Sequence, residues 1–487
     1  MTLAILGLYL ALVLAVGLYG HRLFRGTGED FFLASRSIGP FVLLMTLFGT
    51  HMTAFSLLGA SGEAYHKGIG VFSLMASSSA LVVPVVFLMI GTRLWKIGSR
   101  HGYQTQVQFF RERWGSSGLA LMLFFLLVAF LIPYLLIGVM GGGLTFEEIT
   151  GGQIPRWLGS LVICTVVSIY VTAGGVRSTA WANTLQTLVF MVLGAVTFVV
   201  ILRNLGGLDA ALRSVDPALL MHGDKIPLAT LVSYTVIPLS VGMFPHIFMH
   251  WLTARNEAAF RLPIIAYPLC IAVVWLPSVL LGVVGTAQIP DLQGPAANSV
   301  LLQMIALRAP QVLTGLLGAG VFAAVMSSLD SQILSLSTLF TQDIALRRSA
   351  PGELDEARQV KVGRVFVVLI LALTYGLSLV SDRSIFRLGV WSFTGFAALF
   401  PLVVAAIYWR RSSKQGAWAS VVTVAVLWLY YLVQTWRAPN YTVGGTGLMP
   451  VVIILFASSL AMVVGSLLGP PTERERVRMF FPTFDEN

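Results

Sequence analysis

The sequence predicts an all-α, polytopic membrane protein, and three observations lead to that fold class. Of its 487 residues, 56% are apolar and only 11% are charged, whereas roughly a quarter of an ordinary soluble domain is charged. The apolar residues fall in repeated blocks of about 20, the length that crosses a hydrocarbon core about 30 Å thick. The apolar/polar alternation of strands is missing from these blocks. A soluble globular protein is therefore excluded.

The blocks predict about thirteen transmembrane helices. The longest stretches between them, near 204–227, 288–310 and 347–362, leave no room for a separate soluble domain. We expect the helices near residues 3–20, 40–62, 70–92, 118–142, 156–173, 180–203, 228–252, 262–287, 311–346, 363–381, 385–408, 416–436 and 448–469.

Basic residues predict the orientation of these helices. No Lys or Arg precedes the first block, and Arg22 and Arg25 follow it, which is the reverse of a cleavable signal peptide. Alternate loops, beginning with 21–39, hold most of the 31 Lys and Arg residues, so we expect the N-terminus outside and the C-terminus inside. The net charge of +10 then reflects orientation and contact with anionic lipid, and requires no nucleic-acid partner.

Residue types typical of enzymes are not grouped into a recognisable site. Cys164 and Cys270 both lie inside apolar blocks and suggest neither a disulfide framework nor a metal site. The patterns G-x-S-x-G and H-E-x-x-H and the phosphate-binding loop do not occur. We therefore expect no enzyme, no organic cofactor and no obligate protein partner.

Two of the predicted helices are interrupted halfway along. The second has small and polar residues from Gly49 to Ser56, and the seventh contains Pro245, which removes a backbone donor. They lie five spans apart, and broken helices at matching positions of two five-span halves indicate a solute site at the repeat interface. The predicted division is an extra N-terminal helix and loop (1–39), a first repeat (40–204), an inverted second repeat (228–409) and two extra helices with a short tail (416–487).

The ninth predicted helix is the most polar. Ser327, Ser328 and Ser331 share one helical face, and Asp330 lies at its edge. Hydrogen bonds between helices, worth about 0.6 kcal/mol each, would explain the serines. A carboxylate at the bilayer centre costs at least about 2.5–3.5 kcal/mol unless it is protonated, paired or bound to a cation. Asp330 is therefore predicted to have a functional role.

Four segments together resemble the sodium:solute symporter family, whose members have a leucine-transporter-like core of two inverted five-helix repeats. The likeness covers nearly the whole chain. The segments are 29–39 (EDFFLASRSIG), 59–62 (GASG), 174–186 (GGVR followed by WANTLQ) and 327–343 (SSLDSQILSLSTLFTQD).

The resemblance implies a sodium site and Na⁺ as the coupling ion. Its ligands would be the backbone carbonyls of Gly49, Met52 and Ala324 and the hydroxyls of Ser327 and Ser328. Ligation by oxygen alone suits a hard cation. Independently of the family, an unwound stretch in the second helix would offer free carbonyls that serines of the ninth helix could face.

The sequence departs from the family at a second site. Members with a second sodium site have an aspartate where this chain has Asn183, and Asp330 stands where relatives often have a small hydroxyl residue. Our hypothesis is that the acid has moved across the site, so that Asp330, Ser331 and Asn183 form a second cation or proton site. The alternative is that Asp330 pairs with a basic or amide side chain and only fixes packing.

The solute is expected between the two helix breaks. His250 falls where some relatives have arginine. A partly protonated histidine and a helix N-terminus would both favour a carboxylate. The segment 242–246 (GMFPH) resembles the sixth core helix of proline and monocarboxylate members of the family, and this resemblance implies a monocarboxylate or an amino acid such as proline. A neutral histidine bonded to a carbonyl is the alternative. The candidate residues are His51, Thr53, Phe55, Ser56, Met243, Phe244 and His246.

The resulting prediction is a sodium-coupled symporter in the plasma (inner) membrane that imports a small organic solute by alternating access. Its partners would be Na⁺, the solute and membrane lipid. The alternatives are a sodium-coupled sugar or vitamin symporter and a membrane sensor that binds solute without flux. A channel and an intramembrane enzyme are disfavoured by the matched breaks and by the lack of a nucleophile–base pair.

Overall fold

The computed structural model describes the whole chain except residues 23–27, 222–225, 349–354, 439–440 and 482–487. Arg25, one of the charges used above to predict orientation, therefore lies outside the described residues. Helices make up the regular structure of the described part, in which the β-type pairing is one isolated bridge between Ile38 and Ala254. The all-α fold class is confirmed.

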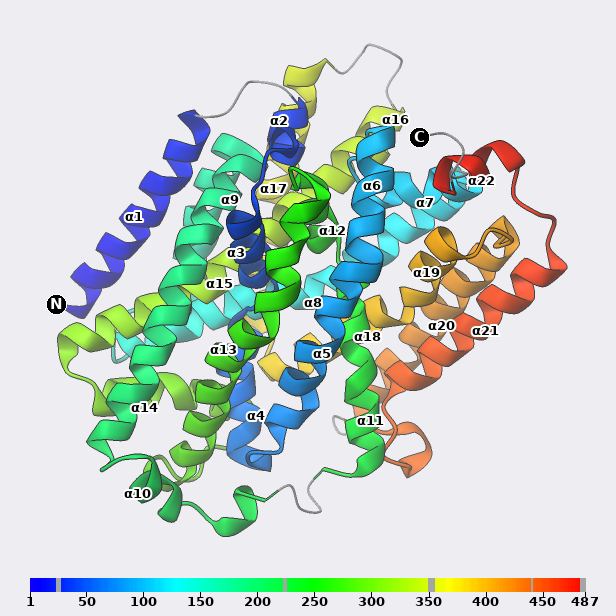
Figure 1. Ribbon diagram of the computed structural model, residues 1–487. Helices are drawn as coiled ribbons and strands as arrows, with labels where there is room; N and C mark the ends of the chain where they lie inside the picture. Colours follow the sequence, from blue (N-terminus) through cyan, green and yellow to red (C-terminus); the bar gives the residue numbers. More distant parts are fainter. Residues whose placement is uncertain (23–27, 222–225, 349–354, 439–440, 482–487) are drawn as a thin grey trace.

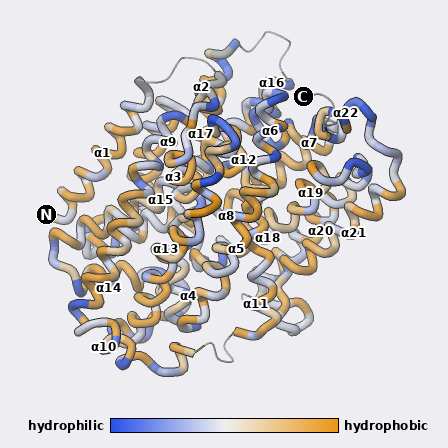
Figure 2. Tube along the Cα trace, in the orientation of Figure 1, coloured by the Kyte–Doolittle hydropathy of each residue, from blue (hydrophilic) through white to orange (hydrophobic). Residues whose placement is uncertain are grey.

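In the described part of the chain, ten helices are long and apolar enough to cross a membrane, and the number is twelve if each of two bent helix pairs counts as one span. Polar residues gather at the two ends of the bundle and apolar ones lie between them (Figure 2). The ten are α1 (Thr2–Arg22), the helix Phe72–His101 that contains α5 and α6, α8 (Ser117–Ile149), α9 (Arg156–Asn204), α13 (Arg261–Gln288), α15 (Gln311–Leu339), α17 (Glu356–Val380), the pair α18 (Ile385–Ala398) and α19 (Phe400–Tyr408), α20 (Lys414–Arg437) and α21 (Pro450–Leu468).

The bent pairs are the helices that the sequence predicts to be broken. In the first, α3 (Pro40–His51) is followed by a turn at Phe55–Gly59 and by α4 (Ala60–Lys67), with a bend of 56°. In the second, α11 (Leu228–Val236) and the turn Ile237–Gly242 precede α12 (Pro245–Thr253), with a bend of 48°. Both pairs lie in the middle of the bundle (Figure 1), so the broken-helix prediction is confirmed.

A single glycine divides α9, where the sequence predicts a loop at 174–179. The helix has 49 residues, and at about 1.5 Å per residue it is about twice as long as a membrane span requires. Its non-helical residue is Gly175 (φ 57°, ψ −145°). The two helices predicted at 156–173 and 180–203 are therefore present as two segments of α9, and one residue in a conformation open to glycine makes the whole change of direction between them. Counting two segments here gives the predicted thirteen spans, but that count stays a prediction.

Replacing Gly175 with Ala should destabilise the protein. A Cβ there would lie 2.3 Å from the carbonyl oxygen of Phe31, and the positive φ disfavours any side chain. Strained backbone of this kind costs about 1–3 kcal/mol, so we expect a lower midpoint of thermal unfolding in detergent. Gly194→Ala is the control, since it lies on the same helix with nothing within 4 Å of the added atom. Equal midpoints for the two variants would contradict this account.

Segments predicted to lie on one side of the membrane contact each other. On the predicted cytoplasmic side, Lys96 pairs with Glu257 (2.8 Å), and the amide of Ile38 donates to the carbonyl of Thr253 (3.0 Å). On the opposite side, the amide of Ile69 donates to the carbonyl of Leu219 (2.8 Å). These contacts agree with the predicted alternation of loops, while which side faces the cytoplasm stays a prediction.

The helices outside the two predicted repeats flank the bundle. In Figure 1, α1 lies at one edge and α20 with α21 at the opposite edge, whereas α15 runs through the interior. Of the most apolar stretch of 18 residues in the span Gln311–Ala345, which contains α15, 83% is buried inside the protein. A polar face on this helix therefore meets protein and not lipid. The division of the chain into repeats stays a prediction.

Candidate ion and solute sites

The break in the first bent pair begins where α3 ends. Met52 has extended backbone (φ −87°, ψ 108°), so the last carbonyls of α3 lose their helical partners. One of these, the carbonyl of His51, accepts a hydrogen bond from the hydroxyl of Tyr134 (3.1 Å). The hydroxyl of Thr53 accepts the amide of Phe55 (2.9 Å) and so caps the following helical segment.

Four of the five predicted sodium ligands, Gly49, Ala324, Ser327 and Ser328, contact one another near this break. The hydroxyl of Ser327 donates to the carbonyl of Gly49 at 3.0 Å and lies 3.2 Å from the carbonyl of Ala324. Ser328 also donates to Ala324 (3.4 Å). A Cβ on Gly49 would lie 2.0 Å from the hydroxyl of Thr187, so close packing requires glycine at this position. Met52 is buried at the end of α3.

Asp330 lies in a buried cluster of hydroxyl and amide groups. One carboxylate oxygen accepts the hydroxyl of Tyr170 (2.8 Å), and the other accepts the hydroxyl of Ser331 (3.1 Å). Ser331 also accepts the side-chain amide of Asn183 (2.8 Å) and lies 3.1 Å from Nε2 of His250. The structure thus brings the three residues of the predicted second site together.

No Lys or Arg of the described residues forms an ion pair with Asp330. Hydroxyls of Tyr170 and Ser331 donate to it, and the side-chain amide of Asn183 also interacts with it. The alternative in which an amide side chain holds Asp330 for packing therefore stays open beside the predicted ion site. The side-chain oxygen of Asn183 has no partner in the described structure. A buried carboxylate without a compensating charge is costly.

The predicted solute residues form an aromatic and histidine cluster between the two breaks. Nδ1 of His51 contacts the hydroxyl of Tyr267, and the ring of Phe244 stacks on that of His246 with centroids 5.0 Å apart. Tyr134 lies 5.7 Å from His246, measured between ring centroids. Both ring nitrogens of His246, which is fully buried, have no hydrogen-bond partner in the described structure. Buried polar groups are almost always bonded, so His246 indicates a place for a ligand.

The predicted hydroxyls of this cluster are used by the local backbone. Thr53 caps the segment after the break, and the hydroxyl of Ser56 donates to the carbonyl of Thr53 (2.8 Å). Met243 presents its carbonyl to the side-chain amide of Gln106 (3.1 Å). The solute role of these residues stays a prediction.

Several contacting residues were not predicted from the sequence. Tyr134 on α8, Tyr267 on α13 and Phe393 on α18 complete the solute cluster, and Tyr170 on α9 completes the Asp330 cluster. Each is an aromatic residue inside an apolar block, where packing is the ordinary explanation. The hydroxyls of the three tyrosines were the available signal, since a buried hydroxyl requires a partner.

An open cavity of about 700 Å³ lies next to the cluster, on the side predicted to be extracellular. Phe386 and Thr394 of α18 line it. Phe386 also stacks on Phe55 (4.8 Å between centroids), and Phe55 packs edge-on against Phe393 (5.2 Å). These three aromatic rings form a layer, called here the aromatic floor, between the cavity and the histidine cluster.

The opposite end of the bundle is tied together by ion pairs. Arg177 on α9 pairs with Asp30 of α2 (Gly28–Leu33). Arg111 of α7 (Gln106–Trp114) and the hydroxyl of Thr105 both bond Asp343. The cavity and these contacts lie at opposite ends of the bundle.

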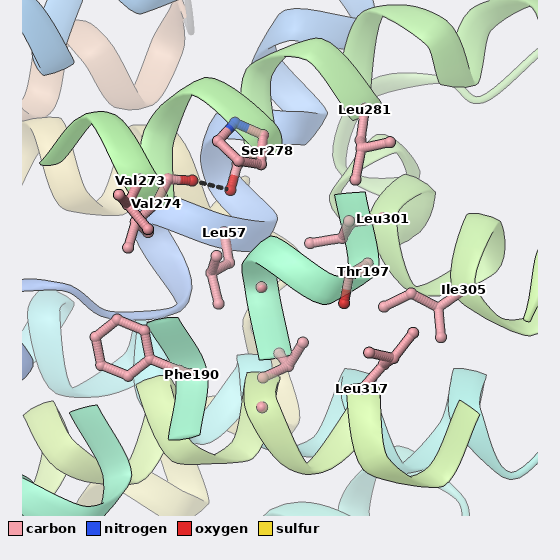
Figure 3. Close-up of a pocket in the computed structure, with 14 residues that line it drawn as sticks. Leu57, Phe190, Thr197, Val273, Val274, Ser278, Leu281, Leu301, Ile305 and Leu317 are labelled. Atoms are coloured by element: carbon pink, nitrogen blue, oxygen red, sulfur yellow. Dashed lines mark hydrogen bonds between the residues drawn. The ribbon is translucent and has the colours of Figure 1, made fainter. Parts of the chain in front are cut away.

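A second, apolar crevice is too small for a solute. It holds about 20 Å³ and lies between α9, α13, α14 (Val300–Arg308) and α15 (Figure 3). Its two hydroxyl side chains are Ser278, which donates to the carbonyl of Val274 (2.8 Å), and Thr197, which donates to that of Leu193 (2.7 Å). No free polar group of its described lining would orient a polar solute.

Two solved structures with a similar fold are those of transporters. The chain is similar to a Na⁺-coupled sialic acid symporter, solved in a substrate-bound, outward-open state, with a TM-score of 0.79, 18% identity, and coverage of 97% of this chain and 98% of that one. It is also similar to Mhp1, a nucleobase-cation-symport-1 family transporter, with a TM-score of 0.59, 14% identity, and coverage of 92% and 97%. The fold is therefore that of a leucine-transporter-like membrane transporter.

The sequence itself assigns the family. The model of the sodium:solute symporter family matches residues 31–423, so the chain belongs to that family. It is 28% identical to the sodium/pantothenate symporter of Escherichia coli (strain K12) over 477 residues, 95% of each chain. It is 25% identical to sodium/proline symporter 2 of Staphylococcus saprophyticus over 455 residues, 87% of this chain and 85% of that one. Membership supports Na⁺-coupled symport of a small molecule by an integral membrane protein.

Proposed function

We propose that this protein imports a small carboxylate-bearing solute across the plasma membrane together with Na⁺, by alternating access. The observation that carries the proposal is the contact across the first helix break, where the hydroxyl of Ser327 meets the carbonyl of Gly49 at 3.0 Å. Oxygen atoms from a broken helix and from a polar helix of the other repeat then converge, as expected of a site for a hard cation. Gly49, Met52, Ala324, Ser327 and Ser328 are the proposed sodium ligands.

A sodium site at this break would couple the ion to solute binding. The same break carries His51 and Phe55, so an ion that orders it also orders the solute cluster. One Na⁺ crossing ~100 mV is worth ~2.3 kcal/mol, and a tenfold concentration gradient adds ~1.4 kcal/mol. Together these support about 500-fold accumulation of a neutral solute.

The second break supports a carboxylate as the bound group. α12 begins at Pro245, and its first amides point out of the helix with the positive end of the helix dipole. His246, in the first turn of α12, adds two ring nitrogens without partners in the described structure. Proline and pantothenate, which the names of the two relatives give as solutes, both carry a carboxylate.

Uptake into proteoliposomes tests the proposal. Labelled pantothenate and proline are offered under an inward Na⁺ gradient and under a K⁺ gradient of the same size. We expect uptake of one of them under Na⁺ alone, with glucose, which has no carboxylate, as the comparison for a sugar symporter. Thermal stabilisation by solute and Na⁺ without any uptake would favour the sensor instead.

His246→Ala should weaken solute binding and leave sodium binding nearly unchanged. Truncation removes the unpartnered ring that faces the solute cluster but does not touch the contact between Ser327 and Gly49. Loss of a hydrogen bond to a charged group costs about 1.5–3 kcal/mol, so the KM for solute should rise about 10- to 150-fold. His66→Ala is the control, since that exposed ring contacts the carbonyl of Gly294 at the protein surface. An unchanged KM for solute would contradict the role of His246.

We also propose a second cation site at Asp330, Ser331 and Asn183. The support is a buried carboxylate that has no ion-pair partner among the described residues and whose neighbour Asn183 has an unpartnered oxygen. Tyr170 and His250 would position this group from α9 and α12.

A further inference from the structure

The open cavity beside the aromatic floor has the size of a binding site. Its volume of about 700 Å³ falls within the usual range for small-molecule sites. The ends of α4, α11, α18 and α20 and the turn after α20 surround it, all on the predicted outer side. It is separate from the histidine cluster, because the rings of Phe55, Phe386 and Phe393 lie between them.

The charged side chains of this cavity are mostly basic. Lys67, Arg383 and Arg387 line it, against one carboxylate, that of Glu63, which pairs with Lys67 at 2.7 Å. Among the lining residues, basic side chains therefore outnumber acidic ones by three to one. Asp382, next to Arg383 in the chain, is not among the lining residues. A cavity with low-dielectric walls focuses such a field and raises the local concentration of anions.

The remaining wall is suited to the body of an organic solute. Aromatic and aliphatic side chains alternate there with hydroxyls, so a solute could bury its carbon chain and still hydrogen-bond. Arginine binds carboxylates through paired N–H groups. The lining residues that supply this wall are Tyr234, Trp391, Thr394, Leu432, Thr435 and Tyr441.

We propose that this outer cavity is a binding site for small organic carboxylates that does not require Na⁺ and that holds an anionic solute next to the aromatic floor before it opens. Its use in import rests on the proposed function, whereas the binding itself does not. The site then selects for anionic solutes before they reach the histidine cluster.

The rates at which charged thiol reagents modify a cysteine in the cavity report the electrostatic potential there. Thr435 lines the cavity and donates to a carbonyl of its own helix, that of Tyr431 (2.9 Å), so Thr435→Cys places a thiol there with little disturbance. The native cysteines, Cys164 and Cys270, are buried, and the parent protein gives their background. The introduced cysteine is modified with an anionic reagent, sulfonatoethyl methanethiosulfonate, and with a cationic one, trimethylammonioethyl methanethiosulfonate. Each modification rate is divided by the rate of the same reagent with a free thiol in solution, and the two normalised rates are compared.

We expect the anionic reagent to modify the cysteine faster than the cationic one. Arg387→Gln should lower the ratio of the normalised anionic rate to the normalised cationic rate about threefold. Arg387→Lys should keep the ratio, which separates loss of charge from loss of fold. Arg156→Gln is the matched control, because it removes one basic charge from the same predicted side, where Arg156 pairs with Glu147 away from the cavity. A ratio near one, or a ratio that Arg387→Gln leaves unchanged, would overturn the proposal.

Protection of the same thiol tests binding. In buffer with K⁺ in place of Na⁺, millimolar pantothenate should slow modification of the Thr435→Cys variant, and panthenol, with an alcohol in place of the carboxylate, should not. Equal protection by both, or by neither, would overturn the carboxylate site. The two proposals fail separately, since protection without Na⁺-driven uptake contradicts import alone, and uptake without protection contradicts this site alone.

Discussion

Replacing Ser327 with Ala is expected to raise the sodium concentration needed for half-maximal uptake about 10- to 150-fold. The change removes one proposed ligand and the hydroxyl that contacts the carbonyls of Gly49 and Ala324. A hydroxyl bonded to a charged group contributes about 1.5–3 kcal/mol, which gives this range. The measurement is initial uptake of labelled solute into proteoliposomes as a function of Na⁺ concentration.

The matched control for this substitution is Ser335→Ala. Ser335 lies on the same helix, is buried, and donates to a carbonyl of its own helix, that of Gln332 (2.8 Å). We expect its sodium dependence to match that of the unaltered protein. If Ser327→Ala and Ser335→Ala have the same sodium dependence, then the contact across the break is a packing contact, and the proposed ion site has lost its support.

Replacing Asp330 with Asn is expected to remove the second coupling ion. The Hill slope of uptake against Na⁺ should fall towards one. Because a second Na⁺ would add the driving force of one further ion, ~2.3 kcal/mol from ~100 mV and ~1.4 kcal/mol from a tenfold gradient, steady-state accumulation should fall by up to about 500-fold.

Tyr170→Phe is the matched control for Asp330→Asn. It removes one hydrogen bond to Asp330, that of 2.8 Å from the tyrosine hydroxyl, and keeps the negative charge. We expect the Hill slope to persist in this variant. If Asp330→Asn changes neither the Hill slope nor the dependence of uptake on pH, then Asp330 serves packing alone and the second site is absent.

Much of the fold could be predicted from the sequence because a membrane restricts the choices. Apolar blocks of span length, with Gly49 and Pro245 inside two of them, indicate helices and helix breaks before any contact is known. The division of α9 into two segments could also be predicted, but the abruptness of the turn between them could not. Residues 174–179 contain two glycines and Arg177 and resemble a loop, but a positive φ at Gly175 suffices to redirect the helix, and Arg177 is held by Asp30.

The candidate sites were predictable only where residue type is unusual for a membrane. A carboxylate at position 330 and paired serines stand out in an apolar helix, so the ion sites could be proposed from sequence. Tyr134, Tyr267 and Phe393 could not, since an aromatic residue in an apolar block has packing as its ordinary role. The outer cavity was also missed, because its basic residues come from α4 and α18, far apart in the chain.

The sequence by itself therefore determined the class of protein, the family resemblance and the places where helices break, because these depend on local composition and on the cost of polar groups in lipid. The tertiary structure decided which groups meet. Ser327 reaches Gly49 from 278 positions away, and Tyr170 reaches Asp330 from 160. Contacts over such separations depend on how whole helices pack, which no local pattern specifies.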